Sequence, residues 1–171
     1  MTVKITILGD THIKSFEKLP KEILGEIQQS EWIIHVGDYT SIQVIKGFIE
    51  LKGTRFRGVY GNADPMDVRD RLESKDILTV QGKKIGFTHP ASGGPEENLE
   101  SKVFTDFEKE DLDVLIYGHT HESKVIHKNN LLLINPGKGY LETNFFGPPT
   151  TVVILIIKGD KIQGTIKEIK S

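Results

Sequence analysis

The sequence predicts an α/β protein. Short apolar runs rich in β-branched residues alternate with stretches whose apolar residues recur at helical spacing, and the second half is rich in strands. In order, the first half predicts a strand at Val3–Leu8, a helix at Lys18–Gln29, a strand at Trp32–Val36, a helix at Ser41–Leu51 and a strand at Thr54–Val59.

The middle of the chain predicts a loop and a hairpin. The segment "ADPMDVRDRL" has the proline and acidic residues of a loop with one helical turn. Two β-rich runs, Asp76–Val80 and Lys84–Thr88, flank "QGKK" and predict a β-hairpin. The segment "SGGPEENLESKVFTDFEKED" then predicts a flexible start followed by a helix.

The second half predicts strands at Val114–Tyr117, Lys124–His127, Leu131–Ile134, Thr151–Ile157 and Gln163–Ile169. There is no internal repeat, low-complexity tract or linker, so we expect one domain over residues 1–171.

Composition limits the kind of site that the chain can carry. Of 171 residues, 37% are hydrophobic and 27% charged, and the formal net charge of −2 offers no general attraction for nucleic acid or anionic membrane. The absence of cysteine excludes disulfides and thiolate metal sites. The N-terminus lacks a signal-peptide pattern, and the longest apolar run, Val152–Ile157, is far below the roughly 20 residues that span a bilayer. We expect a cytoplasmic protein.

Polar residues of the kinds that bind metals follow five of the apolar runs. The motifs are "GDTH" with Asp10 and His12, "GDY" with Asp38, "GNAD" with Asn62 and Asp64, "FTHP" with His89 and "GHTH" with His119 and His121. In a mainly parallel sheet the carboxyl ends of strands open onto one crevice, and glycine lets the chain turn sharply there. We therefore expect these residues to converge.

Each motif alone has an ordinary structural interpretation. "GD" and "GN" are common turn dipeptides, "DTH" suits a helix N-cap, and a single histidine before proline is often packed or hydrogen-bonded. Five such strand ends together favour a metal site. His35 and His127 lie within apolar strands, so both are interpreted as structural.

In this order, the motifs D-x-H, GD, GN, H and GH-x-H resemble those of the calcineurin-like metallophosphoesterases over about Ile5 to Gly137. The small size, "GNAD" and "NPG" are similar to the compact archaeal and bacterial phosphodiesterase branch, which includes the retromer subunit as a relative. The resemblance implies a four-layer α/β/β/α sandwich of two packed mixed sheets, the metallo-dependent phosphatase type.

The resemblance also implies a pair of divalent metal ions bridged by Asp38. One ion would be held by Asp10, His12, Asp38 and His121, and the other by Asp38, Asn62, His89 and His119. Oxygen and imidazole ligands suit Mn²⁺, which we favour, as well as Ni²⁺, Fe²⁺ or Zn²⁺. Ions about 3.5–4 Å apart activate a bridging water, so the expected nucleophile is a metal-bridging hydroxide.

The chain departs from the family pattern at three places. No histidine follows "GN", and we expect Asp64 nearby to orient a metal ligand or a substrate-side water, with a turn or cap role open. Asn62 and Asp64 are the expected catalytic side chains. Pro90 replaces the usual glycine after the fourth ligand, and Lys138 replaces the serine after "NPG". We expect Lys138 to be exposed, with the alternative that it faces the site and holds a phosphate as a point charge. The loop Pro90–Asn98 is expected to form part of the substrate wall.

We expect a metal-dependent phosphodiesterase that acts on a small phosphodiester substrate. The alternative is a non-catalytic protein-interaction scaffold of the retromer-subunit type. Near-neutral charge and the absence of an aromatic-plus-basic tract argue against extended nucleic acid as a partner. A homo-oligomer remains open.

Overall fold

A computed structural model describes residues 1–90, 98–141 and 147–170. The strands in these residues are β1 (Thr2–Leu8), β2 (Trp32–His35), β3 (Phe56–Gly58), β4 (Lys75–Val80), β5 (Lys83–Thr88), β6 (Val114–Tyr117), β7 (Lys124–Lys128), β8 (Leu131–Asn135), β9 (Thr151–Lys158) and β10 (Lys161–Glu168). The α-helices are α1 (Lys21–Gln29), α2 (Ile42–Lys52), α3 (Met66–Arg69) and α4 (Leu99–Asp106), with 3-10 turns η1 (Phe16–Lys18) and η2 (Gly53–Arg55).

The strands form two mixed sheets, as expected. The first sheet has the order β10-β9-β1-β2-β3, and the second has the order β4-β5-β6-β8-β7. Parallel pairing joins β1, β2 and β3 in the first sheet and β5, β6 and β8 in the second. Antiparallel strands flank both parallel groups. None of the helices in the described residues is long and apolar enough to cross a membrane.

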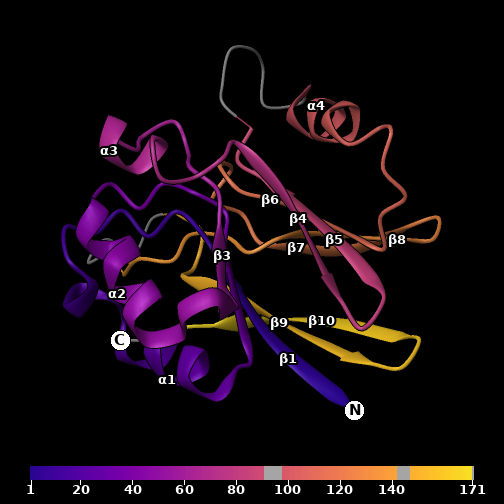
Figure 1. The fold of residues 1–171 in the computed structure, drawn as a ribbon, viewed down its shortest axis with the longest axis horizontal. Coiled ribbons are helices and arrows are strands. Elements are labelled where there is room, and N and C mark those ends of the chain that lie inside the picture. The colour runs from indigo at the N-terminus through magenta and orange to yellow at the C-terminus, as the bar shows by residue number, and fades with distance from the viewer. Residues whose placement is uncertain (91–97, 142–146, 171) are drawn as a thin grey trace.

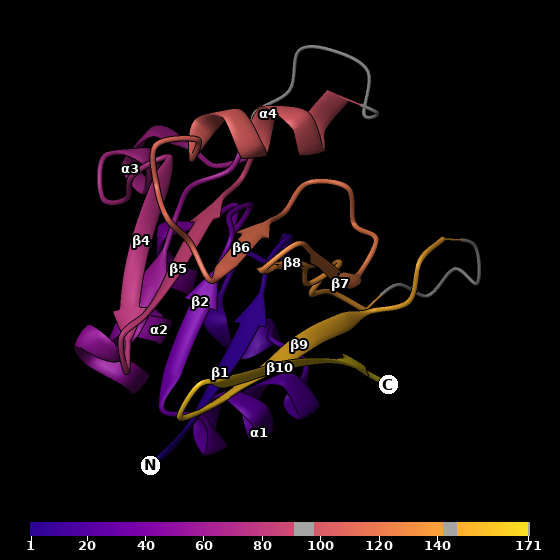
Figure 2. The ribbon, with the colours of Figure 1, turned by 90° about the vertical axis from the view of Figure 1, so that its right-hand side faces the viewer.

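The two sheets pack face to face between outer helices. In Figure 2, α4 lies over the second sheet, and α1 and α2 lie on the opposite side of the molecule, against the first sheet. Figure 1 shows the same separation of α4 from α1 and α2. This is the expected α/β/β/α order of four layers.

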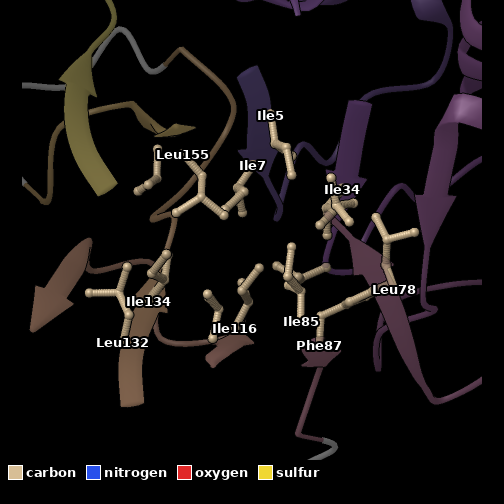
Figure 3. Packing of buried hydrophobic residues seen from close by; sticks show 14 of the residues in the cluster. Ile5, Ile7, Ile34, Leu78, Ile85, Phe87, Ile116, Leu132, Ile134 and Leu155 are labelled. Carbon is tan, nitrogen blue, oxygen red and sulfur yellow. The ribbon is translucent and has the colours of Figure 1, made fainter. Parts of the chain in front are cut away.

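Strand alternation divides the apolar side chains among the layers. On β2, the buried Ile34 joins the core between the sheets, whereas the adjacent Ile33 joins the core beneath α1 and α2. On β6, Ile116 faces the first sheet and Leu115 faces α4. Figure 3 shows the core between the sheets, where side chains from the two sheets face one another. Burying each such side chain contributes about 1.5–3 kcal/mol relative to leaving it exposed.

The largest difference from the predicted elements is at the start of α1, which begins at Lys21 rather than Lys18. Pro20 occupies the N-cap position, and Leu19 before it is extended at φ −60° and ψ 133°. Proline disfavours helical geometry in the residue before it, so Phe16–Lys18 forms a separate 3-10 turn. Similarly, β3 is shorter than expected because Gly53–Arg55 forms η2.

Candidate metal centre

The candidate residues follow the carboxyl ends of five parallel strands. Asp10 and His12 follow β1, Asp38 follows β2, Asn62 follows β3, His89 follows β5, and His119 and His121 follow β6. The first three strands belong to one sheet and the other two to the second sheet. The centre therefore lies where the same ends of both sheets meet.

Most of these residues have an unusual backbone conformation. Asp10, His12, Asp38, His119 and His121 have positive φ angles between 44° and 90°. This conformation costs on the order of 1 kcal/mol or more for a residue with a side chain, and such residues cluster at functional sites. The strain concentrates on the potential ligands themselves, which favours a functional role.

Two of the glycines are required by close approach rather than only by turning. A Cβ at Gly61 would lie 2.1 Å from Asp38 Oδ1 and 2.7 Å from Asp38 N. A Cβ at Gly37, where φ is +96°, would lie 2.8 Å from Gly61 N and 2.9 Å from His89 Nδ1. These glycines let the ends of β2 and β3 approach each other and His89.

Asp10 lies at the centre of one group of potential ligands. Its Oδ1 is 3.3 Å from His121 Nε2 and 3.9 Å from His12 Nε2, while its Oδ2 accepts a hydrogen bond from His119 N at 3.1 Å. Asp10 is fully buried, and within the described residues its Oδ1 has no hydrogen-bond partner. A buried carboxylate oxygen with no donor is strongly disfavoured unless a cation fills the space beside it.

His89, Asn62 and His119 form a second group. His89 Nδ1 lies 2.8 Å from the carbonyl oxygen of Val36. Because that oxygen can only accept, Nδ1 carries a hydrogen, and the ring is held with Nε2 directed away from Val36. Asn62 Oδ1 lies 2.9 Å from His89 Nε2 and 3.0 Å from His119 Nδ1. The Asn62 oxygen and one nitrogen of each ring thus lie close enough together to serve one cation.

Asp38 lies between the two groups. Its Oδ1 accepts a hydrogen bond from Ala63 N at 2.8 Å. Its Oδ2 is 3.4 Å from His12 Nε2 and also 3.4 Å from His89 Nε2. One carboxylate oxygen therefore approaches a histidine from each group.

The electrostatics of the centre favour ionised carboxylates. Burial acts to raise the pKa of Asp10, but the adjacent His12 and His121 lower it more, and the net pKa is well below the usual value. For Asp38 burial likewise raises the pKa, yet His12, His89 and the Ala63 N–H bring it below normal. The two carboxylates, Asp10 first, raise the pKa of His12 to about 9. The centre therefore attracts positive charge.

These donors fit divalent cations. Potential ligand atoms of Asp10, His12 and His121 lie within 4.8 Å of one another, and so do those of Asp10, Asp38 and His89. The oxygen and imidazole atoms are of the kinds that bind first-row divalent metals. Asp10 belongs to both of these sets of three residues, whereas the resemblance assigned it to one ion. The structure brings together all seven expected ligands, and their assignment to individual ions stays a prediction.

Asp64 is buried behind the Asp38 loop. Its Oδ2 accepts backbone N–H groups from Asp38 at 2.9 Å and Gly61 at 2.8 Å, and its Oδ1 accepts the N–H of Thr40 at 2.7 Å. Burial raises its pKa, although these N–H groups act to lower it. Both oxygens are used to hold backbone, the geometry of a residue that orients a ligand loop.

The expectation of an exposed Lys138 is wrong. The residue is buried, and its Nζ lies 4.9 Å from the centroid of the Tyr140 ring. That ring contacts His12 and His121 edge-to-face, with centroids 5.7 and 6.0 Å apart. The sequence did not identify Tyr140 as a neighbour of these two histidines. The only feature that could have pointed to it is the presence of an aromatic residue shortly after "NPG".

The remaining residues that the sequence analysis singled out are two histidines interpreted as structural, Pro90 and the loop after it. His127 is exposed on β7, whereas His35 is fully buried at the end of β2. Pro90, after His89, is buried. Most of the loop expected to form a substrate wall, residues 91–97, lies outside the described residues.

Comparison with known proteins gives one consistent result. A family model described as the calcineurin-like phosphoesterase superfamily domain matches residues 3–160. The chain is 32% identical over 157 residues to a phosphodiesterase of Methanocaldococcus jannaschii, covering 81% of this chain and 87% of that protein.

Solved structures share the fold. The solution structure of a Thermotoga maritima protein has a TM-score of 0.72 and 26% identity, covering 97% of this chain and 99% of that chain. Vacuolar protein sorting 29 of Cryptosporidium parvum has a TM-score of 0.74 and 18% identity, covering 99% of both chains. At that identity, the second likeness concerns the fold alone. This chain belongs to the calcineurin-like phosphoesterase superfamily.

Proposed function

We propose that this chain is a binuclear metal-dependent phosphoesterase that hydrolyses small phosphodiesters. The observation that carries the proposal is the position of Asp38, whose Oδ2 lies 3.4 Å from a histidine of each ligand group. A carboxylate at that position is suited to bridge a pair of cations. The similarity to a phosphodiesterase of Methanocaldococcus jannaschii supports the same activity.

The proposed ligand sets are those that the family resemblance implies. One ion would be held by Asp10, His12, Asp38 and His121, and the other by Asp38, Asn62, His89 and His119. We favour Mn²⁺, with Ni²⁺, Fe²⁺ or Zn²⁺ as alternatives. When bound, a pair of divalent cations supplies Lewis-acid catalysis, because it activates water and neutralises charge on the phosphoryl group.

The chain's own residues orient the centre and the substrate. The Val36 carbonyl holds the His89 ring so that Nε2 faces Asn62 and Asp38. Asn62 is exposed, which supports the catalytic role expected for it, because substrate can approach an exposed side chain. For Asp64 we keep the interpretation in which it orients Asp38, because three backbone N–H groups occupy its carboxylate.

The residue after Asn62 cannot protonate the leaving group of the substrate. Ala63 has no group that can donate a proton, and its N–H is already bonded to Asp38. An alkoxide is a poor leaving group without a general acid, so activated aryl diesters should react faster than alkyl esters.

Hydrolysis by reconstituted protein tests the proposal. Metal-stripped protein is loaded separately with each of the four ions and assayed on bis(p-nitrophenyl) phosphate and p-nitrophenyl phosphate. We expect faster cleavage of the diester with Mn²⁺, and strong loss of activity in His119→Gln. His127→Gln, at an exposed histidine on β7, is the matched control and should retain activity. Preference for the monoester would contradict the diesterase assignment.

A scaffold role is the second candidate, because the fold is shared with vacuolar protein sorting 29. The full set of potential ligands favours the enzyme. Protein that binds both ions but hydrolyses neither ester would favour the scaffold.

A further inference from the structure

His35 is a buried histidine outside the proposed ligand set. It ends β2, two residues before Gly37, and its relative exposure is 0%. Its ring stacks on Tyr39 with centroids 3.8 Å apart and an interplanar angle of 19°. Phe48 of α2 contacts the ring edge-to-face at 5.6 Å. These two aromatic contacts restrict the position of the imidazole.

Both ring nitrogens of His35 make hydrogen bonds, and each bond reaches a different ligand loop. The Gly37 N–H donates to Nδ1 at 3.1 Å, so Nδ1 carries no hydrogen. The hydrogen of the neutral ring is therefore on Nε2, which donates to Thr11 Oγ1 at 3.0 Å. Burial lowers the pKa of His35 to about 3, in agreement with a neutral ring.

Thr11 and Gly37 are adjacent in sequence to proposed ligands. Thr11 lies between Asp10 and His12, and Gly37 directly precedes Asp38. Backbone hydrogen bonds also join the two loops, from Asp10 N to Gly37 O at 2.9 Å and from His12 N to Asp38 O at 3.1 Å. His35 thus adds a side-chain link at the point where the two loops meet.

We propose that His35 is a positioning residue that fixes the Asp10–His12 loop and the Asp38 loop relative to each other, and so sets the affinity for the metal pair. The inference rests on the metal-binding part of the proposed function and not on its hydrolytic part. A single ring with one acceptor and one donor suits the task, because it satisfies both loops at a fixed spacing in a fully buried position.

Four substitutions separate the two hydrogen bonds from the packing of the ring. His35→Asn keeps an acceptor near the position of Nδ1 and removes the contact with Thr11. His35→Gln keeps a donor near the position of Nε2 and removes the contact with Gly37. His35→Phe keeps the aromatic stack and removes both bonds, while Thr11→Val removes the hydroxyl at constant volume.

Titration of metal-stripped protein with Mn²⁺ alone, followed by calorimetry and by electron paramagnetic resonance, is the test. Substitution of residues that orient metal ligands typically weakens metal affinity by about 10- to 100-fold. We expect His35→Phe to weaken both ions by an amount in this range and to reduce the spectrum of the coupled Mn²⁺ pair. Thr11→Val and His35→Asn should weaken mainly the ion proposed for Asp10 and His12, and His35→Gln should weaken both.

Controls distinguish positioning from general stability. Ile27→Val, in the core beneath α1, should lower the unfolding midpoint without changing Mn²⁺ affinity, and His127→Gln should change neither. The double variant Thr11→Val/His35→Asn should bind Mn²⁺ about as tightly as either single variant. The reason is that both substitutions remove the same hydrogen bond, between His35 Nε2 and Thr11 Oγ1.

Several results would overturn the inference. One is a folded His35→Phe that binds both ions with wild-type affinity. Another is a loss of affinity in every variant that simply follows its loss of stability. If His35→Phe does not fold, the inference would be overturned by wild-type Mn²⁺ affinity in both Thr11→Val and His35→Asn. Wild-type protein that binds two ions and hydrolyses no ester would defeat the proposed function alone, whereas protein that binds no Mn²⁺ would defeat both.

Discussion

Replacement of Asp64 by asparagine should destabilise the protein and weaken its metal centre. The carboxylate accepts three backbone N–H groups, two at Oδ2 and one at Oδ1. An asparagine amide must turn its NH₂ group toward one of these sets, so at best one N–H loses its acceptor. Hydrogen bonds to a charged group contribute about 1.5–3 kcal/mol each, and a buried unsatisfied donor costs about 1–3 kcal/mol.

Part of that loss is offset. Burial raises the pKa of Asp64, which means that the buried charge itself is unfavourable, and asparagine removes it. If the preferred orientation leaves only the Thr40 N–H without an acceptor, we expect Asp64→Asn to lower the free energy of unfolding by about 1–3 kcal/mol. Because the Thr40 N–H anchors the loop two residues after Asp38, its loss should also loosen Asp38 and lower the affinity for both ions.

Urea unfolding in the presence of a chelator measures the free energy of unfolding without the contribution of bound metal. Mn²⁺ titration of the same variants, without the chelator, measures the affinity for the ions. Asp70→Asn, which removes an exposed carboxylate nearby in the chain, is the matched control and should change neither value appreciably. An Asp64→Asn protein with wild-type stability and wild-type affinity for both ions would refute this account of Asp64.

Two further substitutions test the packing and the charge of the fold. Gly61→Ala should weaken metal binding and activity because the new Cβ would collide with the Asp38 carboxylate. The control Gly25→Ala, in open space within α1, should instead raise the free energy of unfolding by about 0.5–1 kcal/mol. Equal effects of the two substitutions on metal binding would be inconsistent with the close approach of Gly61 to Asp38. Lys167, followed by Lys4, lowers the pKa of Glu26, so the stabilising contribution of Glu26 is fully present above its ordinary value of 4.5 and is lost as the pH falls through the lower folded value. Glu26→Gln should therefore cost about 0.5–1 kcal/mol at pH 7 and progressively less below pH 4.5, and urea unfolding at several pH values measures the difference.

Local patterns predicted the α/β class and most of the strands and helices, because these depend on periodicities within short segments, whereas the four layers were implied by the family resemblance. The division of Ile33 and Ile34 between two cores is seen only in the structure, because both neighbours are apolar and β2 is buried on both faces. Convergence of the motifs followed from parallel pairing, since the carboxyl ends of parallel strands lie at one edge.

Features that depend on partners distant in sequence were not predictable in the same way. The ring of His35 had an apolar context that indicated only burial, and its link between two loops requires knowledge of where Thr11 lies. Lys138 was expected to be exposed because lysine usually is, yet it packs against Tyr140. The start of α1 was missed because helical spacing of apolar residues continued through Leu19, while Pro20 sets the boundary.

The most direct test of the central claim is the metal content of Asp38→Asn beside that of the wild type, measured by elemental analysis. Asparagine removes the negative charge from the oxygen that lies between His12 and His89, so the repulsion between two dications is less compensated. We predict two ions per chain in the wild type and fewer than two in the folded variant, with diesterase activity lower by at least about two orders of magnitude. A folded Asp38→Asn protein that keeps two ions and near-normal activity would contradict the account.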